Sequence, residues 1–272
     1  MRTVLHLSDL HFGRVDEEVV AGLRRSAHDL APDVVAVSGD LTQRAKRREF
    51  AAATAFLRSL PGAKVVVPGN HDVPLYNVLA RFARPLVRFH DHVDEQFTRP
   101  FVDDEIAVVG VNTARSLVFK GGRINLAQMQ AVREVFCATD SRRVRIVVTH
   151  HPFHLSAPRE DDDLVGRAAL AMQQWRDCMP DVLLAGHMHA HDVGTTAERY
   201  DLDGRSAITV QAGTATSTRA RGERNSFNVL HVDRDSIAVC KYHWSMEQRA
   251  FAPDAGRTYR RHGEAWLRDD PS

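Results

Sequence analysis

The sequence predicts an α/β domain in which two mixed β-sheets pack together and helices flank them. Three observations lead to this fold class. Short runs rich in Val and Ile recur along the 272 residues, helical patterns separate the first of these runs, and short polar links join the later ones. The hydrophobic fraction of 43% is enough to build a sizeable core.

The apolar runs have the length of buried strands, about four to eight residues. They are Thr3–Leu7, Val34–Ser38, Lys64–Val67, Ile106–Val111, Val144–Thr149, Val182–Ala185, Ala207–Gln211, Phe227–Val232 and Ser236–Tyr242. Between the early runs, Glu17–Leu30 and Arg44–Leu60 show helical periodicity. Strand–helix–strand alternation predicts parallel pairing in the first half, whereas the runs from about residue 207 onward are expected to pair antiparallel.

Two segments interrupt this alternation, and both are expected to be insertions where substrate contacts often lie. They are residues 73–105 and residues 153–166. Residues 1–245 are predicted to form one domain, with 73–105 as a helical insertion and 246–272 as a polar C-terminal extension.

Composition and cysteine content exclude several classes of protein. With 36 basic and 35 acidic residues, the net charge of +1 argues against binding to a nucleic acid polymer. Cys137, Cys178 and Cys240 are widely spaced, which predicts neither a disulfide framework nor a thiolate metal site and favours a reducing, cytoplasmic location. We expect no membrane span, because no run of 18 apolar residues occurs, and the N-terminus resembles a first strand rather than a signal peptide.

Histidine is abundant, with 15 residues, and several of them belong to polar clusters that follow predicted strands. The five clusters are Asp9-Leu10-His11, Gly39-Asp40, Gly69-Asn70-His71-Asp72, His150-His151-Pro152 and Gly186-His187-Met188-His189. In open α/β sheets, ligands bind at the carboxyl ends of parallel strands. If these five strands neighbour one another, all five clusters meet on one edge.

The residue types in the clusters favour metal chemistry. Asp, His and Asn without Cys suit Mn, Fe or Zn. The candidate ligands are Asp9, His11, Asp40, Asn70, His150, His187 and His189. Seven ligands are too many for one tetrahedral site and indicate two metal ions that share a bridge, for which a carboxylate such as Asp40 is suited. The glycines before Asp40, Asn70 and His187 permit tight turns beside the site.

The ordered set Asp-x-His, Gly-Asp, Gly-Asn-His-Asp, His-x-Pro and Gly-His-x-His resembles the calcineurin-like metallophosphoesterases, from about residue 3 to 245. The resemblance implies a four-layer αββα sandwich with two divalent or trivalent metal ions at the strand ends. It implies a first metal held by Asp9, His11, Asp40 and His189, and a second held by Asp40, Asn70, His150 and His187. In the fourth motif the family ligand lies two residues before the proline, which matches His150 rather than His151.

The resemblance also implies roles for the residues around the metals. His71 matches a histidine that stabilises charge on the phosphoryl group or protonates the leaving oxygen, and Asp72 would orient it. A metal-bridging hydroxide would attack in line with the leaving group. The implied activity is hydrolysis of small phosphodiesters. The segments Gln211–Thr214 and Asn225–Asn228 resemble the class III cyclic-nucleotide phosphodiesterase branch, which makes 3',5'-cyclic nucleotides candidate substrates.

Other functions stay open at this point. A phosphohydrolase acting on lipid-linked nucleotides would need an apolar groove, and a catalytically inactive protein-binding scaffold would be expected to lose metal ligands or His71. A nuclease is disfavoured by the near-neutral charge. The oligomeric state is open, with a homodimer as one alternative. Residues without an assigned role that could lie near the site are Asn112, Arg115, His151, His191, Arg219, Arg221 and Arg224.

Overall fold

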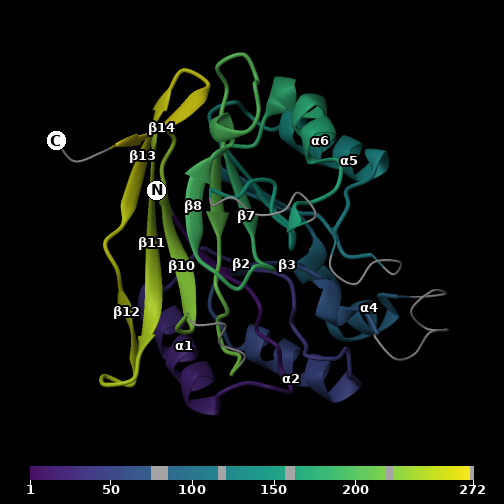
Figure 1. The fold of residues 1–272 in the computed structure, drawn as a ribbon, viewed down its shortest axis with the longest axis vertical. Helices are drawn as coiled ribbons and strands as arrows, with labels where there is room; N and C mark the ends of the chain where they lie inside the picture. The colour runs from purple at the N-terminus through teal and green to yellow at the C-terminus, as the bar shows by residue number, and fades with distance from the viewer. Residues whose placement is uncertain (75–84, 116–120, 157–162, 219–222, 270–272) are drawn as a thin grey trace.

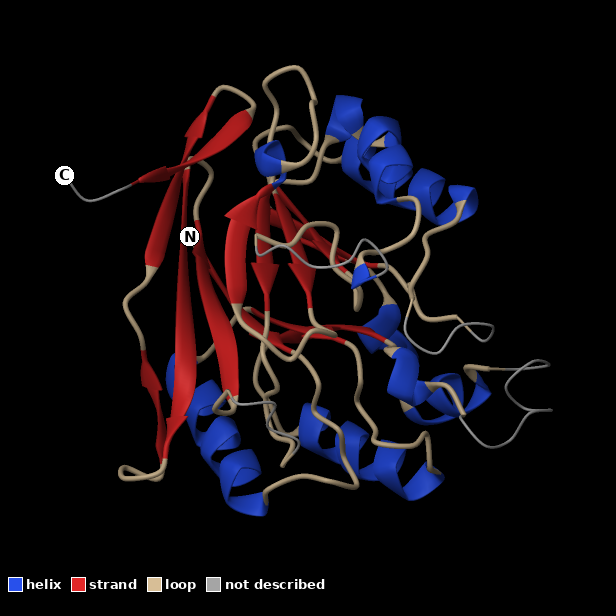
Figure 2. Ribbon diagram, in the orientation of Figure 1, coloured by secondary structure: helices blue, strands red, loops and turns tan. Residues whose placement is uncertain are grey.

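Two β-sheets stack face to face in the computed structural model, and helices cover the outer face of each sheet (Figure 1). Figure 2 shows the helices on the outside of the two layers of strands. The structure describes residues 1–74, 85–115, 121–156, 163–218 and 223–269. The α/β fold class and the four-layer αββα sandwich are confirmed.

The first sheet has eight strands in the order β14-β13-β11-β10-β1-β2-β3, and β12 pairs with β11. Its strands are β1 (Arg2–Leu7), β2 (Val34–Ser38), β3 (Ala63–Val67), β10 (Ser226–Val232), β11 (Ser236–Ser245), β12 (Ala250–Pro253), β13 (Arg257–His262) and β14 (Ala265–Asp269). The pairs β1–β2 and β2–β3 are parallel, whereas β10 to β14 pair antiparallel.

The second sheet has six strands in the order β4-β5-β6-β7-β9-β8. They are β4 (Phe101–Val102), β5 (Ile106–Gly110), β6 (Val144–Val148), β7 (Val182–Ala185), β8 (Asp192–Thr195) and β9 (Ile208–Gln211). β5, β6, β7 and β9 are parallel neighbours. The expectation that every run from about residue 207 onward pairs antiparallel is therefore wrong for β9, which pairs parallel with β7 and antiparallel only with β8.

The helices of the described residues lie on the two outer faces. They are α1 (Glu17–Leu30), α2 (Arg47–Arg58), α4 (Val87–His92), α5 (Leu126–Ala138) and α6 (Ala168–Gln174), with short 3-10 turns η1 (Asn70–Asp72), η2 (Glu95–Thr98), η4 (Arg176–Cys178) and η5 (Thr196–Glu198). α1 begins where Asp16 accepts hydrogen bonds from the amides of Glu18 and Val19. None of these helices is long and apolar enough to cross a lipid bilayer.

Three apolar layers hold the sandwich together. Successive side chains of β1 point to opposite faces, so Val4 packs between the two sheets while Leu5 packs against α1 and α2. A third layer lies between the outer face of the second sheet and α5 and α6, around Phe136 and Trp175. Because both faces of the central strands are buried, these strands are uniformly apolar in sequence.

Several elements lacked a clear signal in the sequence. β4, β8, α5 and α6 were not predicted, and residues 246–269 add β12, β13 and β14 to the first sheet rather than forming a polar tail. Of the expected helical insertion, residues 85–105 contain α4, η2 and β4, and residues 75–84 lie outside the described residues. The same holds for residues 157–162, which make up much of the expected insertion at 153–166.

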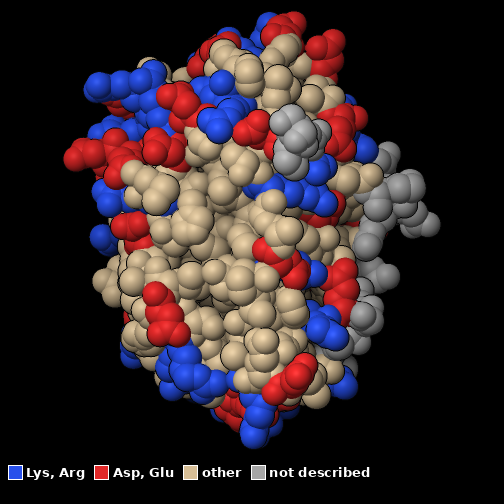
Figure 3. Space-filling model, turned by 90° about the vertical axis from the view of Figure 1, so that its left-hand side faces the viewer, with Lys and Arg blue, Asp and Glu red and all other residues tan. Residues whose placement is uncertain are grey.

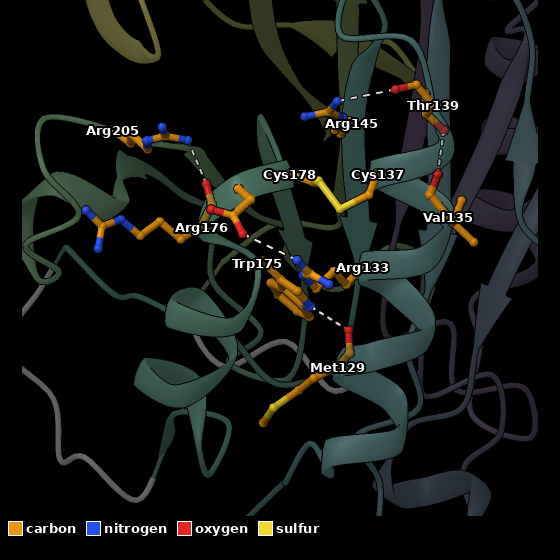
Figure 4. The surroundings of a disulfide bond; sticks show 11 residues. Met129, Arg133, Val135, Cys137, Thr139, Arg145, Trp175, Arg176, Cys178 and Arg205 are labelled. Carbon is orange, nitrogen blue, oxygen red and sulfur yellow. Dashed lines mark hydrogen bonds and ion pairs between the residues drawn. A yellow bond between two sulfur atoms is a disulfide. The ribbon is translucent and has the colours of Figure 1, made fainter.

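A disulfide joins Cys137, in the last turn of α5, to Cys178 in η4 (Figure 4). The expectation of unpaired cysteines is therefore wrong. The sequence separation of 41 positions hid the pairing, because only the packing of α5 beside η4 brings the two Cα atoms to 5.2 Å from each other. The argument for a reducing compartment relied on unpaired cysteines. It no longer holds, because two of the three cysteines form a disulfide and only Cys240 is free.

Replacing both Cys137 and Cys178 with serine should lower the free energy of unfolding. Cross-linking residues separated by 41 positions removes unfolded-state entropy worth about 4 kcal/mol. Urea unfolding of this double variant is the measurement, with Cys240→Ser as the control that removes a thiol but no cross-link. A double variant as stable as the parent would contradict the pairing.

His6 is a fully buried histidine on β1 whose ring nitrogens both have partners. Nε2 lies 2.9 Å from the Ser38 hydroxyl, and the Asn228 side-chain amide nitrogen lies 3.4 Å from Nδ1. These partners fit a neutral ring with its proton on Nε2. Burial, with a smaller contribution from His191, lowers the pKa of His6 to about 3.

Acid should therefore destabilise the fold through His6. Its pKa is near 6.5 in an unfolded chain, so between about pH 4 and 6 only the unfolded state takes up the proton, and the free energy of unfolding falls by up to about 1.4 kcal/mol per pH unit. His6→Gln should reduce this slope in urea unfolding with a chelator present. His231→Gln, at an exposed position on β10, should keep it, and equal slopes in all three proteins would refute this account.

Candidate metal centre

The five polar clusters follow β1, β2, β3, β6 and β7, as the sequence predicts, but these strands are divided between two sheets. The condition that all five neighbour one another is therefore not met. The clusters meet because the two sheets stack with these edges on the same side. Across this junction, Nδ1 of His150, after β6, lies 2.7 Å from the carbonyl oxygen of Ser38 at the end of β2.

One group of candidate ligands comprises Asp9, His11, Asp40 and His189. One ligand atom from each lies within 4.8 Å of the others, and all four residues are buried. Oδ1 of Asp9 lies 3.3 Å from Nε2 of His189 and 3.6 Å from Nε2 of His11. The structure thus brings together the four residues that the resemblance implied for a first metal.

A second group lies beside it and contains Asn70, His150 and His187. Oδ1 of Asn70 is 2.8 Å from Nε2 of His150 and 3.3 Å from Nδ1 of His187. Asp40 lies between the two groups, with Oδ1 3.5 Å from Nε2 of His150 and Oδ2 3.8 Å from Nε2 of His11. One carboxylate oxygen therefore faces each group, which suits a ligand shared by two metal ions.

His151, whose role the sequence left open, is buried against the second group. Its ring centre lies 4.5 Å from that of His187, and Nδ1 lies 2.8 Å from the hydroxyl of Thr113. A Cβ atom at Gly122 would lie 2.2 Å from Nδ1 of His151, so this packing requires glycine there. Neither Thr113 nor Gly122 was singled out from the sequence, because they follow a strand that carries no ligand motif.

The backbone at the centre is strained. Five candidate ligands have a positive φ, with values of 53° at Asp9, 50° at His11, 54° at Asp40, 74° at His187 and 58° at His189. For residues with a side chain this left-handed conformation costs about 1–2 kcal/mol each. Such strain concentrates at functional sites, where the surrounding structure holds it.

Two glycines allow the loops to approach the carboxylates. A Cβ atom at Gly69 would lie 2.1 Å from Oδ1 of Asp40, and one at Gly186 would lie 1.8 Å from the hydroxyl of Ser8. The sequence predicted tight turns at the glycines before Asn70 and His187. The structure shows that the requirement at these two positions is close contact with the neighbouring loop.

Hydrogen bonds orient the candidate ligands and leave one oxygen without a donor. Oδ2 of Asp9 accepts from the Ser8 hydroxyl at 2.6 Å and the His187 amide at 3.2 Å. Oδ1 is buried without a hydrogen-bond partner among the described residues. The Thr214 hydroxyl lies 2.8 Å from Nδ1 of His189, which directs Nε2 towards Asp9. This bare oxygen, facing imidazole nitrogens, fits a cation with mixed nitrogen and oxygen ligands.

The electrostatics favour the protonation states that metal binding needs. Burial raises the pKa of Asp9, but the interaction with His11 and nearby imidazoles outweighs it and holds that pKa well below its usual range. Burial likewise raises the pKa of Asp40, and the imidazoles, His150 first, bring it below its usual value. Burial, together with His150, lowers the pKa of His187 to about 4. At neutral pH these carboxylates are ionised and His187 is neutral.

The buried carboxylate of Asp72 connects the loop after β2 to the loop after β3. Its carboxylate accepts from the amides of Leu41 at 3.1 Å, Thr42 at 2.9 Å and Gly69 at 2.9 Å. Burial, with the charge of Asp40 adding, raises the pKa of Asp72 to about 6. These bonds join the loop after β2 to the loop after β3. The expectation that Asp72 orients His71 directly finds no support in them.

His71 lies at the rim of the centre and is partly exposed. Its amide donates to Oδ1 of Asp40 at 2.8 Å, and Nδ1 lies 2.9 Å from the carbonyl oxygen of Gln43. The ring meets that of His11 edge to face, with centres 4.8 Å apart. A carbonyl at Nδ1 favours a proton on that nitrogen, which makes Nε2 the position for exchanging a proton with a substrate.

The remaining residues that the sequence left without a role do not contact the candidate ligands in any described interaction. The side chain of Asn112 accepts from the amide of Ala114 at 2.9 Å, a local turn contact. The His191 amide lies 3.3 Å from Oε2 of Glu223, beside the first sheet. Arg224 is exposed, and Arg115 is partly exposed with no contact to the ligands among the described residues. Arg219 and Arg221 lie outside the described residues.

Comparison with known proteins decides the family. The model of the calcineurin-like phosphoesterases matches residues 2–191. The chain belongs to this family. No curated protein is similar enough in sequence to be matched. The family uses a binuclear metal centre, and its members hydrolyse phosphoesters, so this protein is a metal-binding phosphoester hydrolase.

Solved structures share the fold of this phosphoesterase at low sequence identity. A dimetal phosphatase from Danio rerio is 13% identical, with a TM-score of 0.63, over 93% of this chain and 98% of its own. A purple acid phosphatase from yellow lupin is 13% identical with a TM-score of 0.64, and this chain spans 53% of its length while 94% of this chain is covered. The protein TT1561 of Thermus thermophilus is 15% identical, with a TM-score of 0.52, over 93% of this chain and 98% of its own.

Asp40→Ala should reduce the occupancy of both metals, because one oxygen of Asp40 faces each group of ligands. Elemental analysis of the phosphoesterase after loading with Mn²⁺ measures the metal-to-protein ratio. Asp140→Ala, which removes an exposed carboxylate paired with Arg142, is the matched control and should keep the parent ratio. Loss of only one of two bound metals in the Asp40 variant would refute the bridge.

Proposed function

We propose that this phosphoesterase hydrolyses small phosphodiesters at a two-metal centre. One metal is held by Asp9, His11, Asp40 and His189, and the other by Asp40, Asn70, His150 and His187. The observation that carries the proposal is the position of Asp40 between two groups of ligands, with one oxygen towards each. The buried Oδ1 of Asp9 faces the imidazoles of His11 and His189 and accepts no hydrogen bond from the described residues, which supports a cation in the first group.

Metal ions held by these ligands would supply water activated at neutral pH and neutralise charge on the phosphoryl oxygens. Other residues of the chain orient the imidazole ligands. The Ser38 carbonyl orients His150 through Nδ1, and the Thr214 hydroxyl does the same for His189. Such outer contacts fix which ring nitrogen faces the metal and raise its basicity. The ligand types suit Mn, Fe or Zn, and the metal pair remains a proposal.

We assign to His71 the role of contacting the phosphate group that reacts. The contact of Nδ1 with the Gln43 carbonyl leaves Nε2 as the nitrogen that can stabilise developing negative charge or donate a proton to the leaving oxygen. Asp72 acts as a positioning residue, because it bonds the backbone of the loops that carry Asp40 and His71.

A cyclic-nucleotide substrate is supported by the two segments that resemble the class III branch. The side-chain amide of Asn225 donates to the carbonyl oxygens of Ser217 at 3.0 Å and Thr214 at 3.4 Å. That of Asn228 donates to the carbonyl oxygen of Gln211 at 3.2 Å. The two segments therefore pack together next to the histidine that Thr214 orients. We propose 3',5'-cyclic nucleotides as the first substrates to test.

The alternatives have less support. A lipid-linked nucleotide would need an apolar groove, whereas the apolar side chains of the 73–105 insertion are expected from the sequence to pack as one face of a helix. Phe89 of this set is buried in the core, and residues 78, 79 and 82 lie outside the described residues. A scaffold without catalysis is disfavoured, since the sequence retains every candidate ligand and His71. A nucleic acid polymer is disfavoured by charge: the face in Figure 3 shows basic and acidic side chains interspersed, without a continuous basic stripe. A cytoplasmic location and a homodimer belong to the same proposal.

The Mn²⁺-loaded protein should hydrolyse a generic aryl phosphodiester, and the substrate panel should include 3',5'-cyclic nucleotides, linear diesters and monoesters. His71→Ala should keep the parent metal content and lose most of the turnover, because the ring acts on the substrate and holds no metal. His28→Ala, at an exposed position on α1, is the control.

The outcomes separate the parts of this proposal. A metal-loaded parent that hydrolyses none of the panel would overturn the phosphodiesterase activity. Parent turnover in His71→Ala would remove the role of His71 while leaving the two-metal centre intact. Faster hydrolysis of linear diesters than of cyclic nucleotides would exclude the narrower substrate class.

A further inference from the structure

A second polar pocket lies at the opposite ends of the strands from the metal centre. It has a volume of about 210 Å³. Arg145 lies near the start of β6, whose far end leads to His150, and Asp181 directly precedes β7, whose far end leads to His187. Charged side chains that line the pocket include Arg145, Asp181, Arg205, Arg234, Arg261 and Glu264. We propose that this pocket binds the phosphate group of a small anion, either inorganic phosphate or a phosphomonoester.

The charges of the lining do not balance. Asp181 pairs with Arg261 at 2.9 Å, and Glu264 pairs with Arg205 at 2.8 Å. The remaining lining carboxylate, on Asp177, pairs at 3.3 Å with an arginine of α5. The three lining carboxylates are thus each paired with an arginine, and Arg145 and Arg234 are the lining guanidinium groups that pair with none of them.

The two guanidinium groups differ in their surroundings. Arg145 makes no ion pair with a described residue, its Nε is buried without a hydrogen-bond partner, and Nη2 makes only a long contact of 3.4 Å to the Thr139 carbonyl. Arg234 makes a long ion pair with Asp235, outside the lining, in which Nε lies 3.9 Å from Oδ1 and both side chains are exposed. Burial lowers the pKa of Arg145, yet arginine stays charged in proteins. An anion in the pocket would supply the missing partner.

The walls of the pocket are held in position. The guanidinium of Arg261 lies 4.5 Å from the ring centre of Trp266, whose Nε1 donates to Asp181 at 3.0 Å. Nη1 of Arg205 donates to the Arg176 carbonyl at 2.7 Å. Figure 4 shows Arg145 and Arg205 beside the disulfide, which holds the wall that contains Asp177 and Met179. Such fixed donors lose little entropy when they bind a ligand.

Size and donor geometry identify the ligand class. A single water needs about 10–15 Å³ on the same measure, so 210 Å³ accommodates a phosphate group with a small organic substituent. The planar fork of a guanidinium matches two phosphate oxygens, and arginine is favoured where phosphate is bound through paired hydrogen bonds. A phosphate anion would supply the partner that Arg145 lacks, and Arg234 lines the same pocket. The pocket shares no lining residue with the metal centre.

The test separates the pocket from the metal centre by using the Asp40→Ala protein as the background. Isothermal titration with inorganic phosphate should still detect binding in this protein. Adding Arg145→Gln should weaken that binding at least tenfold, and adding Arg234→Gln should weaken it measurably. Adding Arg142→Gln, an exposed arginine paired with Asp140 outside the pocket, should not. Titration with glycerol phosphate tells whether free phosphate or a phosphomonoester binds more tightly.

Two results would overturn the proposal. One is the absence of phosphate binding at millimolar concentration in the Asp40→Ala protein. The other is equal binding with and without Arg145→Gln. Circular dichroism checks that each variant is folded, and Arg234→Gln, whose side chain is 58% exposed, provides a second variant with little risk to folding. Loss of phosphoester hydrolysis in Asp40→Ala does not bear on the result, because the readout is binding.

Discussion

The burial of the Asp40 carboxylate between two sets of ligands is the constraint on which the rest of the centre depends. A buried charge is costly unless it is paired or binds a metal. Here imidazoles from both sheets surround the carboxylate, and His150 keeps its pKa below the usual value more strongly than any other group. The two sheets must therefore stack so that the carboxyl ends of β2 and β6 lie next to each other. The hydrogen bond from Nδ1 of His150 to the Ser38 carbonyl shows this contact.

This demand explains the unusual backbone around the ligands. Five left-handed residues together carry strain of several kcal/mol. The hydrogen bonds that Asp72 makes to the loops after β2 and β3 hold part of this strain in place. Gly69 and Gly186 let the loops come closer than any side chain would allow. The buried apolar layers beneath the loops supply the rigid support.

The two ends of the strands have different chemistry. At the carboxyl ends, acidic and imidazole groups converge on a centre suited to cations. At the other end of β6 and β7, guanidinium groups surround a pocket suited to anions, and the disulfide holds one of its walls. A parallel sheet brings equivalent strand ends to the same edge, so the opposite ends of β6 and β7 can each contribute to a separate site.

The sequence by itself predicted the central strands of the two sheets, the helices α1 and α2, and the candidate residues of the centre. These follow from local patterns, since strands buried on both faces are uniformly apolar and an amphipathic helix repeats every 3.6 residues. The family resemblance added the pairing of ligands. Only the tertiary structure decided that the clusters come from two sheets, that Cys137 meets Cys178 and that residues 250–269 extend the first sheet. It also decided that Asp72 bonds the loop backbones. Each of these depends on contacts between residues far apart in the chain, and no local pattern records such contacts.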